Sequence, residues 1–305
     1  MIKRVWLFIA TNFLIMLTIY FMIQLFGLDS VIKEHGIRYS YLAIVCAIWG
    51  TIGALLSLFL AKFITTMLLK IKIIRPAFAN TTERELLDIV YRHARAAGLT
   101  ALPEVGIYRS PELNAFAIGQ TRNKALLAIS SGLLINMQRH EMEGVIAHEI
   151  SHIANGDMVT LTLIQGILHA FVLFLTSIIS YGISLCLALR RGHEKENVRI
   201  SMLSYRLLTM MLSFSFTFLG SLMVSAFSRQ REFLADASSA ELVGRDNMVA
   251  TLRKLQIANE LEEDQPSLLT IFKMTRRPHV LNLFSTHPTI EKRIAHLMRT
   301  PKFKR

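Results

Sequence analysis

Long apolar segments alternate with polar segments along the 305-residue chain. Four apolar segments approach or exceed the roughly 20 residues that a helix needs to cross a bilayer. They run from Val5 to about Gly27, from Tyr41 to about Leu69, from Met158 to Leu189 and from about Leu207 to Phe227. The pattern predicts an α-helical membrane protein with about four transmembrane helices.

For the first segment and for the last two segments, the sequence is compatible with more than one kind of membrane element. Lys3-Arg4 precedes the first segment, as in a signal peptide, but the apolar stretch exceeds the roughly 7 to 15 residues of a signal-peptide core and no clear cleavage site follows, which favours an uncleaved anchor. Gln165 and His169 interrupt the third segment, and Arg206 stands at the mouth of the fourth. These two segments form either full spans or a hairpin partly packed on protein.

The segment between the second and third spans has the pattern of a water-soluble fold. Thr82-Glu83-Arg84-Glu85 fits a helix capping box, and apolar residues then recur at helical spacing until Gly98. Two short runs, Val105 to Tyr108 and Ala125 to Ile129, have the composition of strands. A second soluble segment, Ser228 to Arg305, is mainly helical in pattern.

Composition supports a membrane partner and argues against nucleic acid. Apolar residues make up 52% of the chain, which is unusual for a soluble protein. The net charge is +12, but the basic residues stand beside apolar runs and in the C-terminal part, and they form no stripe interleaved with aromatic residues. Cys46 and Cys186 both lie in apolar runs, so no disulfide framework or cysteine zinc cluster is expected.

A helix-compatible run from about Arg139 to Ala154 carries the pattern His-Glu-x-x-His and ends at Asn155-Gly156. Because four residues advance a helix by slightly more than one turn, His148 and His152 share a face and can bind one metal ion. Glu149 lies at the edge of that face, where its carboxylate can reach a water molecule at the metal. The apolar neighbours predict a buried helix, in which these three polar side chains need partners that a zinc site supplies.

A catalytic zinc has three protein ligands and one open position, so the motif requires a third ligand. The best candidate is Glu232, and Asp236, about one turn further along a probable helix, can hydrogen-bond a ligating histidine. The alternative is that both acids are solvated and balance nearby arginines, and the spacing alone does not decide between these interpretations.

The side of the membrane that carries this site follows from flanking charges. His152 and Glu232 can bind one metal if the chain crosses the membrane an even number of times between them, which two spans or a non-crossing hairpin both satisfy. Seven basic residues favour a cytoplasmic site: Lys3, Arg4, Lys70, Lys72, Arg75, Arg229 and Arg231. Four in the opposite loop oppose it: Arg190, Arg191, Lys195 and Arg199. We predict the cytoplasmic side.

Several motifs in order along the whole chain resemble those of the HtpX family, bacterial membrane-bound zinc endopeptidases related to the prenyl-protein proteases. Besides the spans, the motifs are Asn114 to Ala117 (NAFA), His148 to Asp157 (HEISHIANGD), Glu232 to Asp236 (EFLAD) and Ser285 to Pro288 (STHP). The resemblance implies an α+β zincin-like (gluzincin) catalytic domain. It also implies quality-control cleavage of misfolded or damaged membrane proteins at the cytoplasmic face of the bacterial inner membrane.

The same resemblance implies roles for individual residues. His148, His152 and Glu232 are expected to bind one zinc ion per subunit, with Glu149 as the general base. By comparison with the prenyl-protein proteases, two further residues, Asn114 and His287, are expected to donate hydrogen bonds to the substrate or the tetrahedral intermediate. The segment that begins at Asn114 is expected to form an edge strand to which the polypeptide substrate adds.

These features predict four regions. Residues 1–69 form an N-terminal transmembrane hairpin, and residues 158–227 a second one. Residues 70–157, with the zinc-motif helix, and residues 228–305, with the third ligand, together form the catalytic domain.

Two other classes of function are alternatives to a protease. A membrane scaffold or chaperone with a structural zinc predicts a closed site, but no convincing fourth protein ligand stands out. A metal transporter should place polar ligands within several spans, whereas only Gln165 and His169 lie within one.

Overall fold

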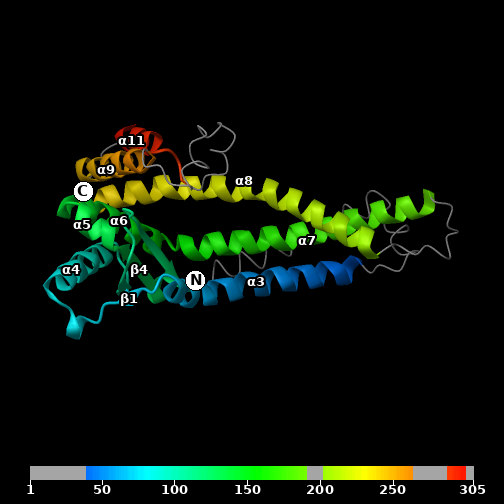
Figure 1. Cartoon of the computed structure of the whole chain (residues 1–305), viewed down its shortest axis with the longest axis horizontal. Helices are drawn as coiled ribbons and strands as arrows, with labels where there is room; N and C mark the ends of the chain where they lie inside the picture. The colour runs from blue at the N-terminus through cyan, green and yellow to red at the C-terminus, as the bar shows by residue number, and fades with distance from the viewer. Residues whose placement is uncertain (1–38, 191–201, 264–286, 300–305) are drawn as a thin grey trace. The chain divides into compact units, whose positions relative to one another are not determined.

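A computed structural model describes residues 39–190, 202–263 and 287–299 of the chain (Figure 1). The predicted span from Val5 to Gly27 lies outside these residues. The chain divides into two units, one with residues up to Leu56 and Thr162–Val224, the other with Ser57–Leu161 and the residues from Ser225 on. The limits of the units fall within three long helices, α3, α7 and α8.

The first unit is built from parts of α3 (Tyr39–Leu68), α7 (Asp157–Arg190) and α8 (Met202–Val243). These are the three helices, among the residues that the structure describes, that are long and apolar enough to cross a membrane. They contain the second, third and fourth predicted segments. Large apolar side chains on α8, such as Phe214 and Met223, are more than 70% exposed, which suits contact with lipid.

One glycine allows two of these helices to approach closely. A Cβ atom on Gly50 of α3 would lie 2.6 Å from the Cβ of Ala170 on α7, so only glycine fits at this contact. A Cβ on Gly53 would meet no described atom within 4 Å. Among the described residues, Gly50 and not Gly53 therefore makes a contact that only glycine allows.

The second unit contains a four-stranded mixed sheet in the order β1-β2-β4-β3. Its strands are β1 (Lys72–Ile73), β2 (Glu104–Tyr108), β3 (Ala115–Gly119) and β4 (Ala125–Ser130). β2 and β4 are parallel and central, whereas β1 and β3 are antiparallel to their neighbours and lie at the edges. Both predicted strands are confirmed, and β4 is buried along its whole length because it lies inside the sheet.

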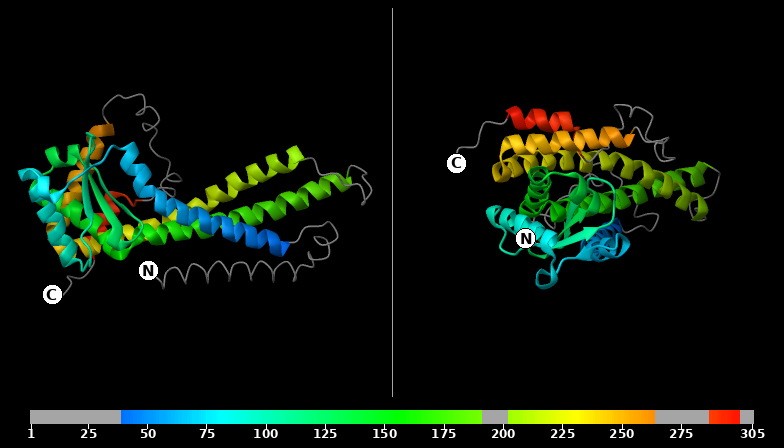
Figure 2. Two further views of the ribbon diagram at one scale, coloured as in Figure 1. Left: turned by 90° about the horizontal axis from the view of Figure 1, so that it is seen from below. Right: turned by 60° about the vertical axis from the view of Figure 1, so that its left-hand side comes forward.

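Helices cover one face of this sheet (Figure 2). The helices that supply buried residues to this face are α4 (Thr81–Ala96), α5 (Ser131–Asn136) and α6 (Arg139–Asn155). The unit also contains η1 (Pro76–Phe78), η2 (Arg122–Lys124), α9 (Arg245–Glu263) and α11 (Ile290–Arg299), and α11 packs on α9. Val90 of α4, Ile129 of β4 and Ile150 of α6 are fully buried in one core. A smaller cluster around Leu126 and Tyr108 lies on the other face. The mixed α+β architecture that the sequence predicted is thus present.

The predicted capping box at Thr82 is wrong, because α4 begins two residues earlier. Asn80 is the N-cap: its Oδ1 accepts a hydrogen bond from the backbone N–H of Glu83 at 2.8 Å, and Glu83 Oε2 accepts from the backbone N–H of Asn80 at 3.0 Å. Asparagine is a stronger N-cap than threonine, and Glu83 gains a second partner in Lys72, whose Nζ lies 2.9 Å away.

Helix α6 has the limits that the sequence predicted to within a residue. Gln138 caps its start with Glu141, and Gly156 ends it in the left-handed conformation at φ 67°, which glycine adopts without strain. α6 packs on α4 and on β3 and β4, and α9 packs on its other side. The His-Glu-x-x-His motif therefore lies on a helix that is held from several directions.

Close packing of α6 against α9 predicts a large effect of Gly144→Ala. A Cβ on Gly144 would lie 2.1 Å from Oγ1 of Thr251, so we expect the helices to be forced apart and the protein to lose about 1–3 kcal/mol of stability, measured by thermal unfolding in detergent. In a Thr251→Ala background the same change should cost less, because Oγ1 and Cγ2 are gone and only the Cβ of residue 251, at 2.9 Å, remains close. An equal cost in both backgrounds would show that this contact is not the cause.

Candidate metal centre

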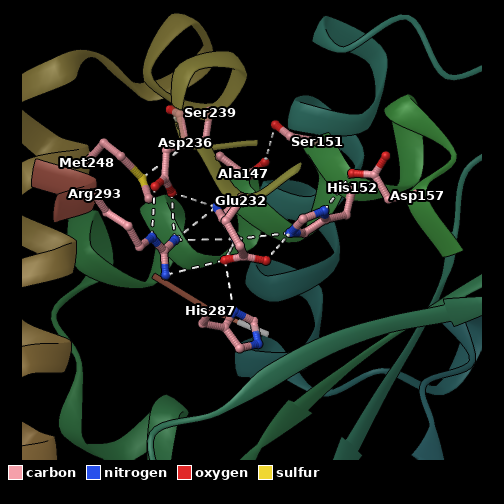
Figure 3. A network of polar contacts seen from close by, with 11 residues as sticks. Ala147, Ser151, His152, Asp157, Glu232, Asp236, Ser239, Met248, His287 and Arg293 are labelled. Carbon is pink, nitrogen blue, oxygen red and sulfur yellow. Dashed lines mark hydrogen bonds and ion pairs between the residues drawn. The ribbon is translucent and has the colours of Figure 1, made fainter. Parts of the chain in front are cut away.

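Helices α6 and α8 bring together the three residues that the sequence singled out for a metal (Figure 3). The Nε2 atoms of His148 and His152 are 3.1 Å apart. Glu232 Oε1 lies 3.3 Å from His152 Nε2, and Glu232 Oε2 lies 3.5 Å from His148 Nε2. No other group of three such side chains was found in the part of the chain that the structure describes.

These separations fit a tetrahedral zinc ion. Ligand atoms about 2.0–2.1 Å from a tetrahedral centre lie about 3.3–3.4 Å from one another. The observed distances of 3.1, 3.3 and 3.5 Å are near that value, although the last two run to different oxygens of Glu232. Two imidazole nitrogens and one carboxylate oxygen are a donor set typical of catalytic zinc, which keeps its fourth position open. His148, His152 and Glu232 could therefore hold one zinc ion.

Each histidine has an aspartate next to its Nδ1 atom, the ring nitrogen that does not face the other two side chains of the cluster. Asp236 Oδ1 lies 3.0 Å from His148 Nδ1, which is the position that the sequence proposed for Asp236. Asp157 Oδ2 lies 2.8 Å from His152 Nδ1. Carboxylates that accept from Nδ1 leave Nε2 free to face the centre. Asp157 was missed as a functional residue, although it follows the αL glycine that ends the motif helix.

The aspartates and Glu232 also change the acidity of the histidines. Burial lowers the pKa of His152, but hydrogen bonds to Asp157 and Glu232 outweigh it and raise the pKa to about 10. For His148, burial again lowers the pKa, and the bonds to Asp236 and Glu232 more than offset it, so the pKa is raised. Metal binding at these nitrogens therefore releases protons and strengthens as the pH rises.

Two arginines hold the aspartates in place, and sequence reasoning missed the role of both. Arg293 of α11 forms a two-pronged ion pair with Asp236 (Figure 3). Arg231 pairs with Asp157. A signal for Arg293 exists in the sequence. It shares a helical face with Ile290, Ile294 and Leu297, and a charge within an apolar stripe indicates a buried partner.

The other predicted site residues have different surroundings. Glu149 is half-buried on α6, and its charge contributes to the raised pKa of His152, yet among the described residues no hydrogen bond or ion pair of its carboxylate is found. His287 Nδ1 lies 2.9 Å from Glu232 Oε2, while its side chain stays 65% exposed. Asn114 precedes the edge strand β3, with its backbone bonded to Ser130. The structure brings His287 to the cluster and places Asn114 in the sheet beside α6.

Comparison with known proteins identifies the family of the chain. The model for peptidase family M48 matches residues 80–300. The chain belongs to peptidase family M48. The protease HtpX of Nitrosococcus oceani is 43% identical over 302 residues that cover 97% of this chain and 99% of that protein. An HtpX homologue of Bacillus licheniformis is 38% identical, with 97% and 98% covered.

A solved structure of this fold is also similar. The crystal structure of S. mikatae Ste24p matches with a TM-score of 0.58 at 17% identity, over 97% of this chain. The chain spans 66% of the length of that protein. At this identity the match shows a shared fold.

Membership of M48 decides the class of function. The chain is a metalloprotease, a hydrolase with a metal ion, and it has helices suited to a membrane. The predicted resemblance to HtpX proteases and the predicted enzyme class are both confirmed. A non-catalytic scaffold and a metal transporter, the two rival classes, lose their support.

Proposed function

We propose that the chain is a membrane-anchored zinc endopeptidase that cleaves misfolded or damaged membrane proteins at the cytoplasmic face of the bacterial inner membrane. The observation that carries the proposal is the spacing of the donor atoms of His148, His152 and Glu232, which fits one zinc ion. Glu149 follows His148 on α6, and its carboxylate, with no hydrogen bond or ion pair found among the described residues, is available to accept a proton.

Each side chain then has a defined task. His148, His152 and Glu232 hold the zinc. When bound, zinc polarises a peptide carbonyl and lowers the pKa of a water molecule to about 7. Glu149 takes a proton from the attacking water at its carboxylate and passes it to the leaving amine. Asp236 is proposed to fix the ring of His148 by accepting from its Nδ1.

Substrate recognition is proposed to use the exposed edge of the sheet. β3 pairs with β4 on one side, and no described strand pairs with its other side. An extended substrate can add to that edge through backbone hydrogen bonds. Asn114, just before β3, and His287, exposed beside Glu232, are proposed donors to the substrate or to the tetrahedral intermediate.

The proposed location follows from the charges and from the relatives. Lys70, Lys72 and Arg75 follow the membrane helix α3 directly, and basic residues next to a span favour the cytoplasmic side. The similar proteins from Nitrosococcus and Bacillus are bacterial proteases. Glu232 is on α8, a helix with an apolar part suited to a membrane, and this favours substrates that are themselves membrane proteins.

Metal removal tests the proposal. The full-length protein, purified in detergent with a chelator and then reloaded with zinc, should cleave casein only after reloading. It should also cleave a heat-unfolded membrane protein faster than the folded form of the same protein. Cleavage that persists without metal would contradict the zinc mechanism. Equal rates on folded and unfolded forms would contradict the proposed substrate preference.

A further inference from the structure

Arg293 is a buried cation on α11. It is 8% exposed, although it stands on the apolar face of α11 between Ile290 and Leu297. Its guanidinium makes two parallel bonds to Asp236, from Nε to Oδ2 at 2.7 Å and from Nη2 to Oδ1 at 2.6 Å. A buried guanidinium is stable only with such a carboxylate partner.

Asp236 is shared between Arg293 and the candidate metal centre. Its side chain is completely buried, and the oxygen that accepts from Arg293 Nη2 is the same Oδ1 that lies 3.0 Å from His148 Nδ1. Nη1 of Arg293 also lies 3.5 Å from Oε2 of Glu232, and Nη2 lies 3.4 Å from both ring nitrogens of His148. These contacts are longer than the two bonds to Asp236, which are the main polar contacts of the guanidinium. Because the guanidinium fork is planar and rigid, it fixes the carboxylate plane of Asp236, and that plane fixes the direction of the His148 ring.

We propose that Arg293 is a positioning residue for His148 and that it acts through Asp236. The inference rests on the proposed zinc site and adds to it the residue that orients one of its ligands. The C-terminal helix α11 thereby contributes to the geometry of the metal centre, although none of its own side chains is among the three that would hold zinc.

The second histidine has a parallel arrangement. Arg231 pairs with Asp157, and Asp157 lies 2.8 Å from Nδ1 of His152. In both arrangements an arginine neutralises the aspartate, so that the pair adds no net charge behind the histidine. Arg231 is next to Glu232 in the chain, and a change there would also disturb Glu232. Arg293 is therefore the residue that gives an unambiguous test.

The test measures zinc binding rather than cleavage. All variants are made in the full chain with Glu149→Gln, so that self-cleavage cannot remove material. Zinc affinity is measured by competition with a chelating dye, and the visible absorption of bound Co²⁺ reports ligand geometry. Arg293→Met should weaken zinc binding by about 10- to 100-fold and alter the Co²⁺ spectrum. Lys292→Met, at the exposed neighbouring position of α11, should match the parent.

Two further variants separate positioning from simple packing. Arg293→Lys keeps the charge but lacks the fork, so it should recover only part of the affinity. The double variant Asp236→Asn with Arg293→Met should bind zinc about as well as Asp236→Asn alone, because Arg293 acts through Asp236. The double variant removes both charges, so neither is left unpaired in the interior. If Arg293→Met does not fold, comparison of the double variant with Asp236→Asn still tests whether Arg293 acts through Asp236.

Two results would overturn the inference: parental zinc affinity with the parental Co²⁺ spectrum in Arg293→Met, or losses that multiply in the double variant. If the parent itself bound no zinc, the proposed function would fail as well. If the parent bound zinc and Arg293→Met bound it equally, only the positioning role would fall.

Discussion

Replacing Glu149 by glutamine is expected to slow peptide cleavage by a factor of about 10² to 10⁴ while zinc binding is unchanged. Glutamine has the size of glutamate but cannot take up the proton of the attacking water. Glu149 is also not one of the three residues whose donor atoms converge, so its loss should leave the metal in place. Initial rates of casein cleavage and zinc content of the same preparation measure both effects.

The matched control for this variant is Glu241→Gln, which makes the same chemical change at an exposed position of α8. It should cleave at the parental rate. If Glu149→Gln bound zinc and cleaved at the parental rate, Glu149 could not be the base. If it lost zinc, Glu149 would belong to the metal-binding set.

The parts of the site that could be predicted are those that local geometry determines. His148 and His152 share a face because four residues make about one helical turn, and Gly156 ends that helix because glycine tolerates positive φ. The strand at Ala125 to Ser130 was visible because a strand buried on both faces is a continuous apolar run.

Tertiary contacts explain what the sequence did not reveal. Arg293 and Asp236 are 57 residues apart, and no spacing rule links an arginine on one helix to an aspartate on another. The start of α4 was misplaced for a similar reason, since Lys72 of the neighbouring strand stabilises Glu83 in its capping position. The two-residue strand β1 is too short to give a periodic pattern, and it exists because β2 offers it a partner.

Helix α8 contributes two residues to the proposed metal centre. α8 supplies Glu232 and Asp236 from a single turn, so one helix provides both a proposed zinc ligand and the group that orients another. Its apolar part is suited to a membrane. A helix that is apolar enough to cross a membrane thus carries the residue whose loss we expect to affect the metal most.

Replacing Glu232 by alanine is expected to lower zinc affinity by more than the roughly 10- to 100-fold that loss of an outer hydrogen-bond partner causes, because it removes one of only three donor atoms. Zinc at 100 times its Kd should stabilise the parent by about 2.7 kcal/mol, so its thermal unfolding should shift upward with zinc and that of Glu232→Ala should not. Glu232→Gln, which keeps the size, separates loss of binding from loss of folding, and Glu241→Ala on the same helix should shift like the parent. A parental shift in Glu232→Ala would remove Glu232 from the metal centre.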